Sequence, residues 1–305
     1  MSKNTKIRIG KTEWKNPVTT GSGTFGSGLA MTGYVDLNRL GAITIKGTTL
    51  EPRPGNLPPR MVETRSAVLG SVGLENPGVE AVLKDIIPKV ALYDSVLVVN
   101  IGGSSVEDYG EVAARLNTSP DVDAIEINIS CPNLKKGGLG FGTDPEMAGL
   151  VVNAVRRNTD KTVIAKLTPA VTDITVMAKA ARDNGADALT LCNGYPGLAI
   201  STKTRKPILG NIQGGICGPS LKPLNMLHVW KTSQAVDIPI IALGGIMNAE
   251  DAIEYILAGA TGVSIGTGNL VDPAITMKVA DGIEQYLEES EFDDINELIG
   301  LAWKK

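Results

Sequence analysis

The chain has 305 residues, of which 43% are apolar and 20% charged, with a formal net charge of −4 at neutral pH. A single domain of this length buries about three quarters of its unfolded surface, so its stability requires neither disulfides nor metals. The near balance of 29 basic and 33 acidic residues argues against nucleic acid as the main partner. The composition also excludes a disordered chain, a collagen and a disulfide scaffold.

The cysteines and histidine are few. Cys131, Cys192 and Cys217 are too sparse for a disulfide framework and suit a reducing compartment. With His228 as the only histidine, a Cys/His zinc site cannot be assembled. No signal-peptide pattern opens the chain, and no stretch reaches the roughly 18 apolar residues that span a bilayer. We therefore expect a cytoplasmic protein with no metal and no membrane partner.

Short apolar runs rich in β-branched residues recur along the chain, and most precede a longer amphipathic stretch. Because these runs are apolar on both faces, they predict a parallel sheet covered by helices. The predicted strands are 17–21, 42–46, 95–101, 123–130, 162–168, 187–193, 238–244 and 262–267. The clearest predicted helices are 145–158, 175–184, 248–258 and 272–288.

Eight strands that alternate with helices predict a single-domain (β/α)8 TIM barrel over residues 1–305. No strand is followed by the Gly-x-Gly-x-x-Gly that an open dinucleotide-binding sheet usually shows. Residues 7–14 (IRIGKTEW) predict a small hairpin that caps the bottom of the barrel. Residues 47–78 and 193–223 are Gly- and Pro-rich insertions after strand ends, where we expect long functional loops on the active-site face.

Glycines follow the last two predicted strands. Residues 243–246 read Leu-Gly-Gly-Ile, and residues 265–268 read Ile-Gly-Thr-Gly. Either pair alone would fit a tight turn. On adjacent strands they favour a phosphate-bearing cofactor that is held by backbone N–H groups.

Polar side chains stand near the ends of five successive predicted strands. An amide or lysine in an otherwise apolar strand is costly unless it has a partner. Five at one rim indicate a polar, ring-shaped ligand in the barrel mouth, for which a lysine would stabilise a reduced, anionic flavin. A flavin-free lyase or isomerase with a Schiff-base lysine, Lys46 or Lys166, remains an alternative. The five residues are Lys46, Asn100, Asn128, Lys166 and Asn193.

The most specific segment is Asn128-Ile-Ser-Cys131-Pro-Asn133, followed by GGLGFG at residues 137–142. It resembles the catalytic loop of the class 1 dihydroorotate dehydrogenases, FMN-binding barrels that use cysteine as their base. Further similarity runs nearly end to end, including NPVTTGSGTF at 16–25, IKGTTLEPR at 45–53 and GGICGP at 214–219. GLENPG at 73–78 and TPAVTD at 168–173 are most similar to the heterotetrameric subtype.

The resemblance implies a role for each matching residue. Cys131 would be the catalytic base, taking a proton from C5 of a dihydropyrimidine while hydride leaves C6 for the flavin. A thiol suits this work, because its unperturbed pKa of about 8.5 lies near the operating range. FMN would be surrounded by Ser22, Lys46, Gly47, Asn100, Asn128, Lys166, Cys192, Gly218, Gly244, Gly245, Gly266 and Thr267. The substrate would be surrounded by Lys46, Gly70, Ser71, Val72, Gly73, Leu74, Asn128, Asn133, Asn193 and Gly194.

Two of these positions depart from the family pattern. The substrate loop of the family begins Asn-x-x-Gly-Leu, whereas residues 70–74 read Gly-Ser-Val-Gly-Leu. The family has Asn-Thr or Asn-Ser after the sixth strand, whereas this chain has Asn193-Gly194. Because two polar side chains are missing, a related flavoenzyme that acts on another dihydropyrimidine or cyclic amide is the alternative to a dihydroorotate dehydrogenase.

The resemblance also bears on partners and on the remaining residues. The heterotetrameric subtype has a second subunit with FAD and an iron–sulfur cluster, which three scattered cysteines cannot supply here. We expect a homodimer, with or without that second subunit. Cys217 and His228 are expected to pack rather than to react, and Cys192 to line the flavin through its backbone.

Overall fold

The fold is built around one parallel sheet. The computed structural model describes residues 3–130 and 139–304, so the predicted Cys131 and Asn133 lie outside the described residues. Within them, eight parallel strands follow the order β3-β16-β15-β10-β9-β8-β7-β4. Their bounds are β3 Val18–Thr20, β4 Ala42–Thr48, β7 Val96–Ile101, β8 Ala124–Asn128, β9 Thr162–Lys166, β10 Ala188–Leu191, β15 Ile240–Leu243 and β16 Gly262–Ile265. All eight coincide with the predicted strands, so the TIM-barrel prediction is confirmed.

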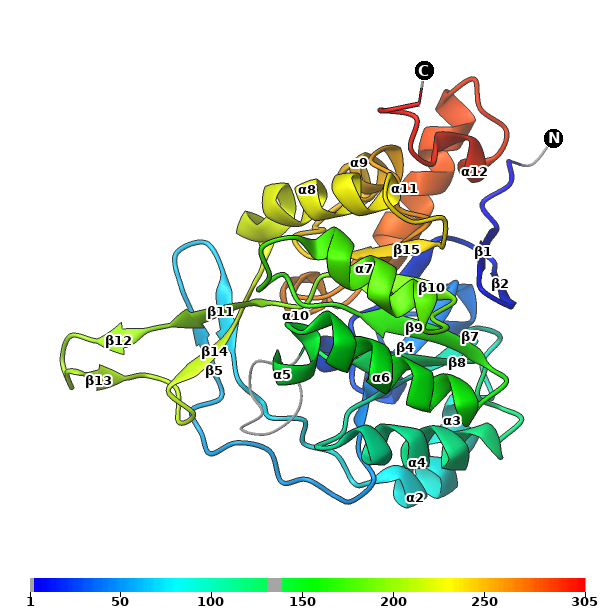
Figure 1. The fold of residues 1–305 in the computed structure, drawn as a ribbon. Helices are drawn as coiled ribbons and strands as arrows, with labels where there is room; N and C mark the ends of the chain where they lie inside the picture. Colours follow the sequence, from blue (N-terminus) through cyan, green and yellow to red (C-terminus); the bar gives the residue numbers. More distant parts are fainter. Residues whose placement is uncertain (1–2, 131–138, 305) are drawn as a thin grey trace.

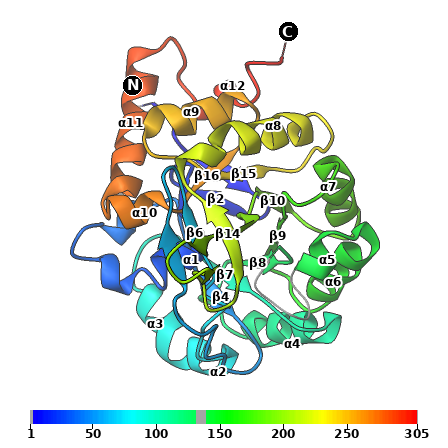
Figure 2. The ribbon, with the colours of Figure 1, turned by 90° about the vertical axis from the view of Figure 1, so that its left-hand side faces the viewer.

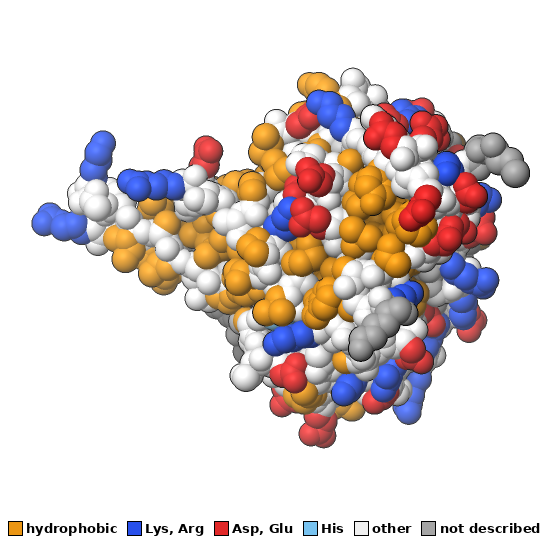
Figure 3. Space-filling model, turned by 90° about the horizontal axis from the view of Figure 1, so that it is seen from above, with side chains coloured by type: hydrophobic (Ala, Val, Ile, Leu, Met, Phe, Trp, Pro, Cys, Tyr) orange, Lys and Arg blue, Asp and Glu red, His pale blue; other side chains and the backbone are white. Residues whose placement is uncertain are grey.

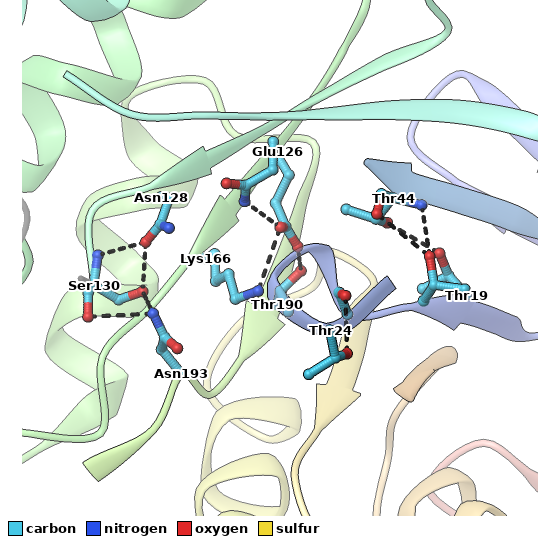
Figure 4. Close-up of polar contacts among 12 residues, drawn as sticks. Thr19, Thr24, Thr44, Glu126, Asn128, Ser130, Lys166, Thr190 and Asn193 are labelled. Atoms are coloured by element: carbon cyan, nitrogen blue, oxygen red, sulfur yellow. Dashed lines mark hydrogen bonds and ion pairs between the residues drawn. The ribbon is translucent and has the colours of Figure 1, made fainter. Parts of the chain in front are cut away.

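Threonine side chains join the first and last strands of this sheet. Thr19 Oγ1 and Thr44 Oγ1 lie 3.0 Å apart, and the Thr44 backbone N–H donates to Thr20 Oγ1 at 3.1 Å. Both bonds are buried between β3 and β4 (Figure 4). Together with a backbone hydrogen bond from Gly41 to Val18, these hydroxyls bridge the two edges of the sheet and complete the barrel.

Helices surround the barrel as a ring (Figure 2). This view is from the side on which a hairpin of residues 200–207 projects from the barrel. Their starts follow local sequence: Ser105 and Asp108 form a capping box at α4, and Asp144 caps α6. The long helices are α4 Val106–Asn117, α6 Pro145–Arg157, α7 Ile174–Asp183, α8 Lys222–Ser233, α9 Ala249–Leu257 and α11 Ile275–Glu289. The short ones are α1 Ser22–Phe25, α2 Val79–Ala81, a π-helix Val82–Ile86, α3 Ile87–Val90, α5 Leu139–Gly142, α10 Gly268–Val271, α12 Ile295–Leu298 and 3₁₀ turns Leu29–Met31, Leu37–Arg39 and Pro219–Leu221.

The N-terminal hairpin lies where it was predicted. Strands β1 (Ile7–Ile9) and β2 (Thr12–Trp14) pair antiparallel, with Ile9 and Trp14 fully buried. The Lys11 backbone N–H donates to Thr162 Oγ1 at the start of β9. The hairpin therefore covers the end of the barrel opposite the strands' carboxyl ends.

The prediction of long loops at residues 47–78 and 193–223 is wrong in part. The two insertions together form a second sheet. Its antiparallel order is β11 (Tyr195–Leu198), β14 (Gln213–Cys217), β6 (Val68–Gly70) and β5 (Met61–Glu63). Figure 1 shows this sheet beside the barrel mouth, continued outward by the hairpin β12 (Ile200–Ser201) and β13 (Lys206–Pro207). Figure 3 shows basic side chains at the end of this arm.

The described helices include none that is long and apolar enough to cross a membrane.

Candidate functional site

Two cavities lie side by side at the carboxyl ends of the barrel strands. The larger has a volume of about 240 Å³ and the smaller about 120 Å³. Their walls share seven residues, including Ser22, Lys166 and Asn193. The second sheet contributes Gly70 from β6 and Gly215 from β14 to the larger cavity, so this sheet forms part of its wall. Two ligands bound in these cavities would be in contact.

The smaller cavity is lined largely by backbone. Gly244 and Gly245 follow β15 with φ of 123° and 75°, a region that glycine adopts without strain. A Cβ at Gly244 would stand 2.2 Å from Asn225 Nδ2, so only glycine fits there. No described residue accepts a hydrogen bond from the backbone N–H of Gly245, Gly266 or Thr267. These donors fit a phosphate, as the glycine pattern predicted.

Eleven of the twelve residues predicted to surround FMN line one cavity or both. Asn100 does not. Its side chain is fully buried and its amide donates to the Glu126 carboxylate deeper in the barrel. Asn100 Oδ1 has no partner among the described residues and would stand 2.9 Å from a Cβ at Gly47. The eleven are Ser22, Lys46, Gly47, Asn128, Lys166, Cys192, Gly218, Gly244, Gly245, Gly266 and Thr267.

The ten residues predicted to surround the substrate divide into four groups. Ser71 does not line a cavity; it is buried and its hydroxyl accepts from Asn56 and Asn211. Gly194 lines the smaller cavity, and Asn133 lies outside the described residues, as does the predicted base Cys131. The other seven line the larger cavity: Lys46, Gly70, Val72, Gly73, Leu74, Asn128 and Asn193.

Two of the polar side chains at the rim, Asn128 and Asn193, form a network around Ser130 (Figure 4). Asn128 Oδ1 accepts from the Ser130 hydroxyl at 3.1 Å and from its backbone N–H at 3.3 Å. Asn193 Nδ2 donates to Ser130 Oγ at 2.9 Å, and Asn193 Oδ1 accepts from the Gly194 backbone at 2.9 Å. The strand ends of β8 and β10 are thus tied together directly before Cys131.

The two strand-end lysines have different surroundings. Lys166 is buried, and its ammonium lies 3.5 Å from Glu126 Oε2 (Figure 4). Lys46 is partly exposed and lies 4.0 Å from Glu75, which also pairs with Arg60 at 2.7 Å. Lys46 also borders a third cavity of about 450 Å³.

Sequence reasoning missed Glu126 and Thr190. Glu126 is 4% exposed, and its Oε1 accepts from Thr190 Oγ1 at 2.8 Å inside the barrel. A carboxylate in the middle of the apolar run 123–130 was the available signal, because such a charge must be paired.

Burial disfavours the charged form of both described thiols. Burial raises the pKa of Cys192 strongly, and it also raises the pKa of Cys217, although Lys166 opposes this shift. Cys217 was expected only to pack, but it lines both cavities. His228, on α8, lies 3.0 Å from the Tyr195 hydroxyl and stacks on its ring, which fits the expected packing role.

The two glycines that depart from the family pattern differ physically. A Cβ at Gly70 would have no atom within 4 Å, so that position is open space beside the larger cavity. A Cβ at Gly194 would stand 2.7 Å from the Ile216 carbonyl oxygen and 2.9 Å from Cys217 Sγ. Only the first position has room for the missing side chain.

Comparison with known proteins agrees with this geometry. A family model described as dihydroorotate dehydrogenase matches residues 4–287. A protein of Desulforamulus reducens named dihydroorotate dehydrogenase B (NAD(+)), catalytic subunit, is 50% identical over 302 residues, covering 99% of each chain. Proteins of the same name from Desulforudis audaxviator and Bacteroides fragilis are 49% and 48% identical, over 99% and 96% of this chain and 98% and 97% of their own. The chain therefore belongs to the dihydroorotate dehydrogenase family of oxidoreductases.

Proposed function

We propose that this chain is an FMN-dependent enzyme that oxidises dihydroorotate to orotate in pyrimidine biosynthesis. The observation that carries the proposal is the pair of contiguous cavities. One is lined by glycines with unpaired N–H donors, the other by a lysine and two amides, and Lys166 borders both. The relatives that are about half identical over nearly the whole chain carry this activity in their names.

The smaller cavity suits FMN. Its phosphate would accept hydrogen bonds from the free backbone donors of Gly245, Gly266 and Thr267. Its ring system would lie against Ser22 and Lys166, toward the larger cavity. When bound, FMN supplies the acceptor for the hydride that leaves C6 of the substrate.

The larger cavity would hold the substrate. Lys46 offers a cation for the substrate carboxylate, and the Asn128 amide faces the same space. Cys131 would take the proton from C5, and Asn133 would contact the ring from the same segment. Met61, Val68 and Leu270 contribute apolar walls, against which the ring of the substrate would pack.

We also propose one FMN-binding domain over residues 1–305 and a cytoplasmic complex of more than one chain. The names of the relatives describe a catalytic subunit, which implies a partner subunit. That partner would carry FAD and an iron–sulfur cluster, and two copies of this chain would form the central dimer.

One observation favours a second candidate substrate, another dihydropyrimidine or cyclic amide. The open space at Gly70 leaves room for a ring other than dihydroorotate. The family assignment disfavours the flavin-free lyase or isomerase that the two lysines left open.

A substrate panel tests the proposal. The protein is reconstituted with FMN, the released ligand is identified by mass spectrometry, and turnover with an artificial electron acceptor is measured. Dihydroorotate is compared with dihydrouracil and dihydrothymine. We expect FMN as the ligand and at least about tenfold preference for dihydroorotate, equivalent to 1.4 kcal/mol. FAD or no flavin, or preference for a ring without a carboxylate, would contradict it.

A further inference from the structure

Glu126 is a buried carboxylate that does not line either cavity. It lies on β8, opposite Asn100 on the neighbouring β7, and its side chain is 5% exposed. Among the described residues, Glu126 is the only acidic side chain within 4.0 Å of Lys166. The cation borders both cavities, and the carboxylate lies behind it (Figure 4).

The hydrogen bonds around Glu126 show that it acts as an acceptor. Asn100 Nδ2 donates to Oε2, the atom that also faces Lys166, and Thr190 Oγ1 donates to Oε1 at 2.8 Å. An ionised carboxylate accepts on both oxygens in this way. Two neutral donors therefore hold the carboxylate in one orientation, with its charge directed at the lysine ammonium.

The combined charge of Glu126 and Lys166 acts on a ligand bound in the cavities that Lys166 borders. A lysine beside a flavin stabilises the reduced, anionic form by Coulomb attraction. A carboxylate behind that lysine offsets part of the attraction, because charges in a buried site are weakly screened. The combined pair presents less positive charge to the cavity than Lys166 alone would.

We propose that Glu126 is a positioning residue: it holds Lys166 Nζ at the floor of the two cavities and, by partly neutralising it, sets the reduction potential of the bound flavin. The proposal rests on the proposed function, because it requires FMN in the smaller cavity. It assigns Glu126 no contact with cofactor or substrate.

The midpoint potential of the FMN-loaded protein, measured by spectroelectrochemistry at fixed pH, tests the proposal. Glu126→Gln keeps the shape and one of the two acceptor oxygens, replaces the other oxygen with an NH₂ group, and removes the charge. We expect the reduced flavin to be favoured at least about tenfold more in the variant, a shift of about 30 mV to more positive potential for a two-electron couple. An unchanged or more negative potential would overturn the proposal.

Thr190→Val is the matched control. It removes a hydrogen bond from the same carboxylate without changing its charge, so we expect its potential to stay close to wild type. A shift as large as that of Glu126→Gln would mean that local structure, not charge, sets the potential, and would overturn the proposal.

The lysine supplies a second test. If the two charges oppose each other at the flavin, Lys166→Met should shift the potential in the direction opposite to Glu126→Gln, to more negative values, because it removes the cation that stabilises the reduced flavin. An unchanged or more positive potential in Lys166→Met would overturn the proposal. If Glu126→Gln alone does not fold because it leaves a buried cation unpaired, the double variant, which has neither charge, should fold. If neither Glu126→Gln nor the double variant folds, Glu126 has a purely structural role, and the proposal is overturned.

Failure of the proposed function can be distinguished from failure of the proposal for Glu126. Wild-type protein that takes up no FMN on reconstitution would contradict the cofactor assignment itself, before any variant is compared.

Discussion

Asn193, directly after β10, donates from Nδ2 to the hydroxyl of Ser130 at 2.9 Å. Ser130 in turn donates to Asn128 Oδ1 at 3.1 Å. Asn128 and Asn193 were expected to contact the substrate, yet each also braces the residue that precedes Cys131. The rim amides therefore line the larger cavity and also hold Ser130, the residue before the proposed base Cys131.

Ser130→Ala tests this bracing. The change removes two neutral hydrogen bonds, each worth about 0.5–1.5 kcal/mol, from a fully buried site. We expect the rate of flavin reduction by dihydroorotate to fall by at least about fivefold while FMN content stays the same. Stopped-flow absorbance under anaerobic conditions measures the rate. Ser290→Ala, which removes a similar bond at the end of α11, is the control and should leave the rate unchanged.

Cys131→Ser should retain FMN and slow flavin reduction by about 10²–10⁴-fold, the usual contribution of a positioned acid–base group. In the proposed mechanism, the Cys131 thiolate of the wild type is the base. Its fraction increases with pH, so the rate should increase by up to about tenfold per unit below the thiol pKa. Reduction at the wild-type rate in the variant, or a rate independent of pH, would remove Cys131 from the mechanism.

Cys217→Ser is the matched thiol control. Cys217 lines both cavities, but burial raises its pKa, so it stays protonated at neutral pH. We expect flavin reduction within about threefold of wild type, since a protonated thiol supplies no base. A loss as large as that of Cys131→Ser would assign the base to the wrong cysteine.

Gly244→Ala should yield a folded protein with at least about tenfold weaker FMN binding. The new Cβ would stand 2.2 Å from Asn225 Nδ2, and alanine is strained at a φ of 123°. Titration of apo-protein with FMN, followed by flavin fluorescence, gives the affinity. Gly33→Ala, at an exposed turn with no atom within 4 Å of the new Cβ, should bind like wild type. Equal affinity in both variants would remove this turn from the cofactor site.

The two departures from the family pattern should respond differently to restoration. Gly70→Asn enters open space beside the larger cavity, so the protein should fold normally. If dihydroorotate is the substrate, its KM should change by less than about tenfold, equivalent to 1.4 kcal/mol. A large gain in dihydroorotate activity would instead show that the wild-type site is shaped for another ring.

Gly194→Thr should be destabilising, because its Cβ would meet the Ile216 carbonyl and Cys217 Sγ. Overpacking of this kind costs about 1–3 kcal/mol, which a denaturant titration of the folded protein detects. An unchanged free energy of unfolding would mean that the β14 backbone shifts to accommodate the threonine side chain.

The barrel strands could be predicted because each is a short apolar run bounded by turn residues. The prediction at 187–193 differs from β10 (Ala188–Leu191) only at its ends. The second sheet could not be predicted, since β6 pairs with β14, about 145 residues further along the chain. Neither three-residue β6 nor glycine-rich β14 has an alternating pattern that identifies it alone.

The candidate site was predictable where a backbone pattern determines it. Two glycine turns after neighbouring strands identified the smaller cavity. Asn100 was misplaced because strand position gives the rim but not the depth of a side chain, and its amide turns to Glu126. The difference between Gly70 and Gly194 depends on atoms of β14, which no local sequence feature reports.

Anaerobic titration of the FMN-loaded wild-type protein with dihydroorotate tests the central claim most directly. The account predicts that the flavin absorption band bleaches, that one orotate appears per flavin reduced, and that dihydrouracil at the same concentration bleaches at least about tenfold more slowly. A flavin that stays oxidised with dihydroorotate, or that dihydrouracil reduces faster, would contradict it.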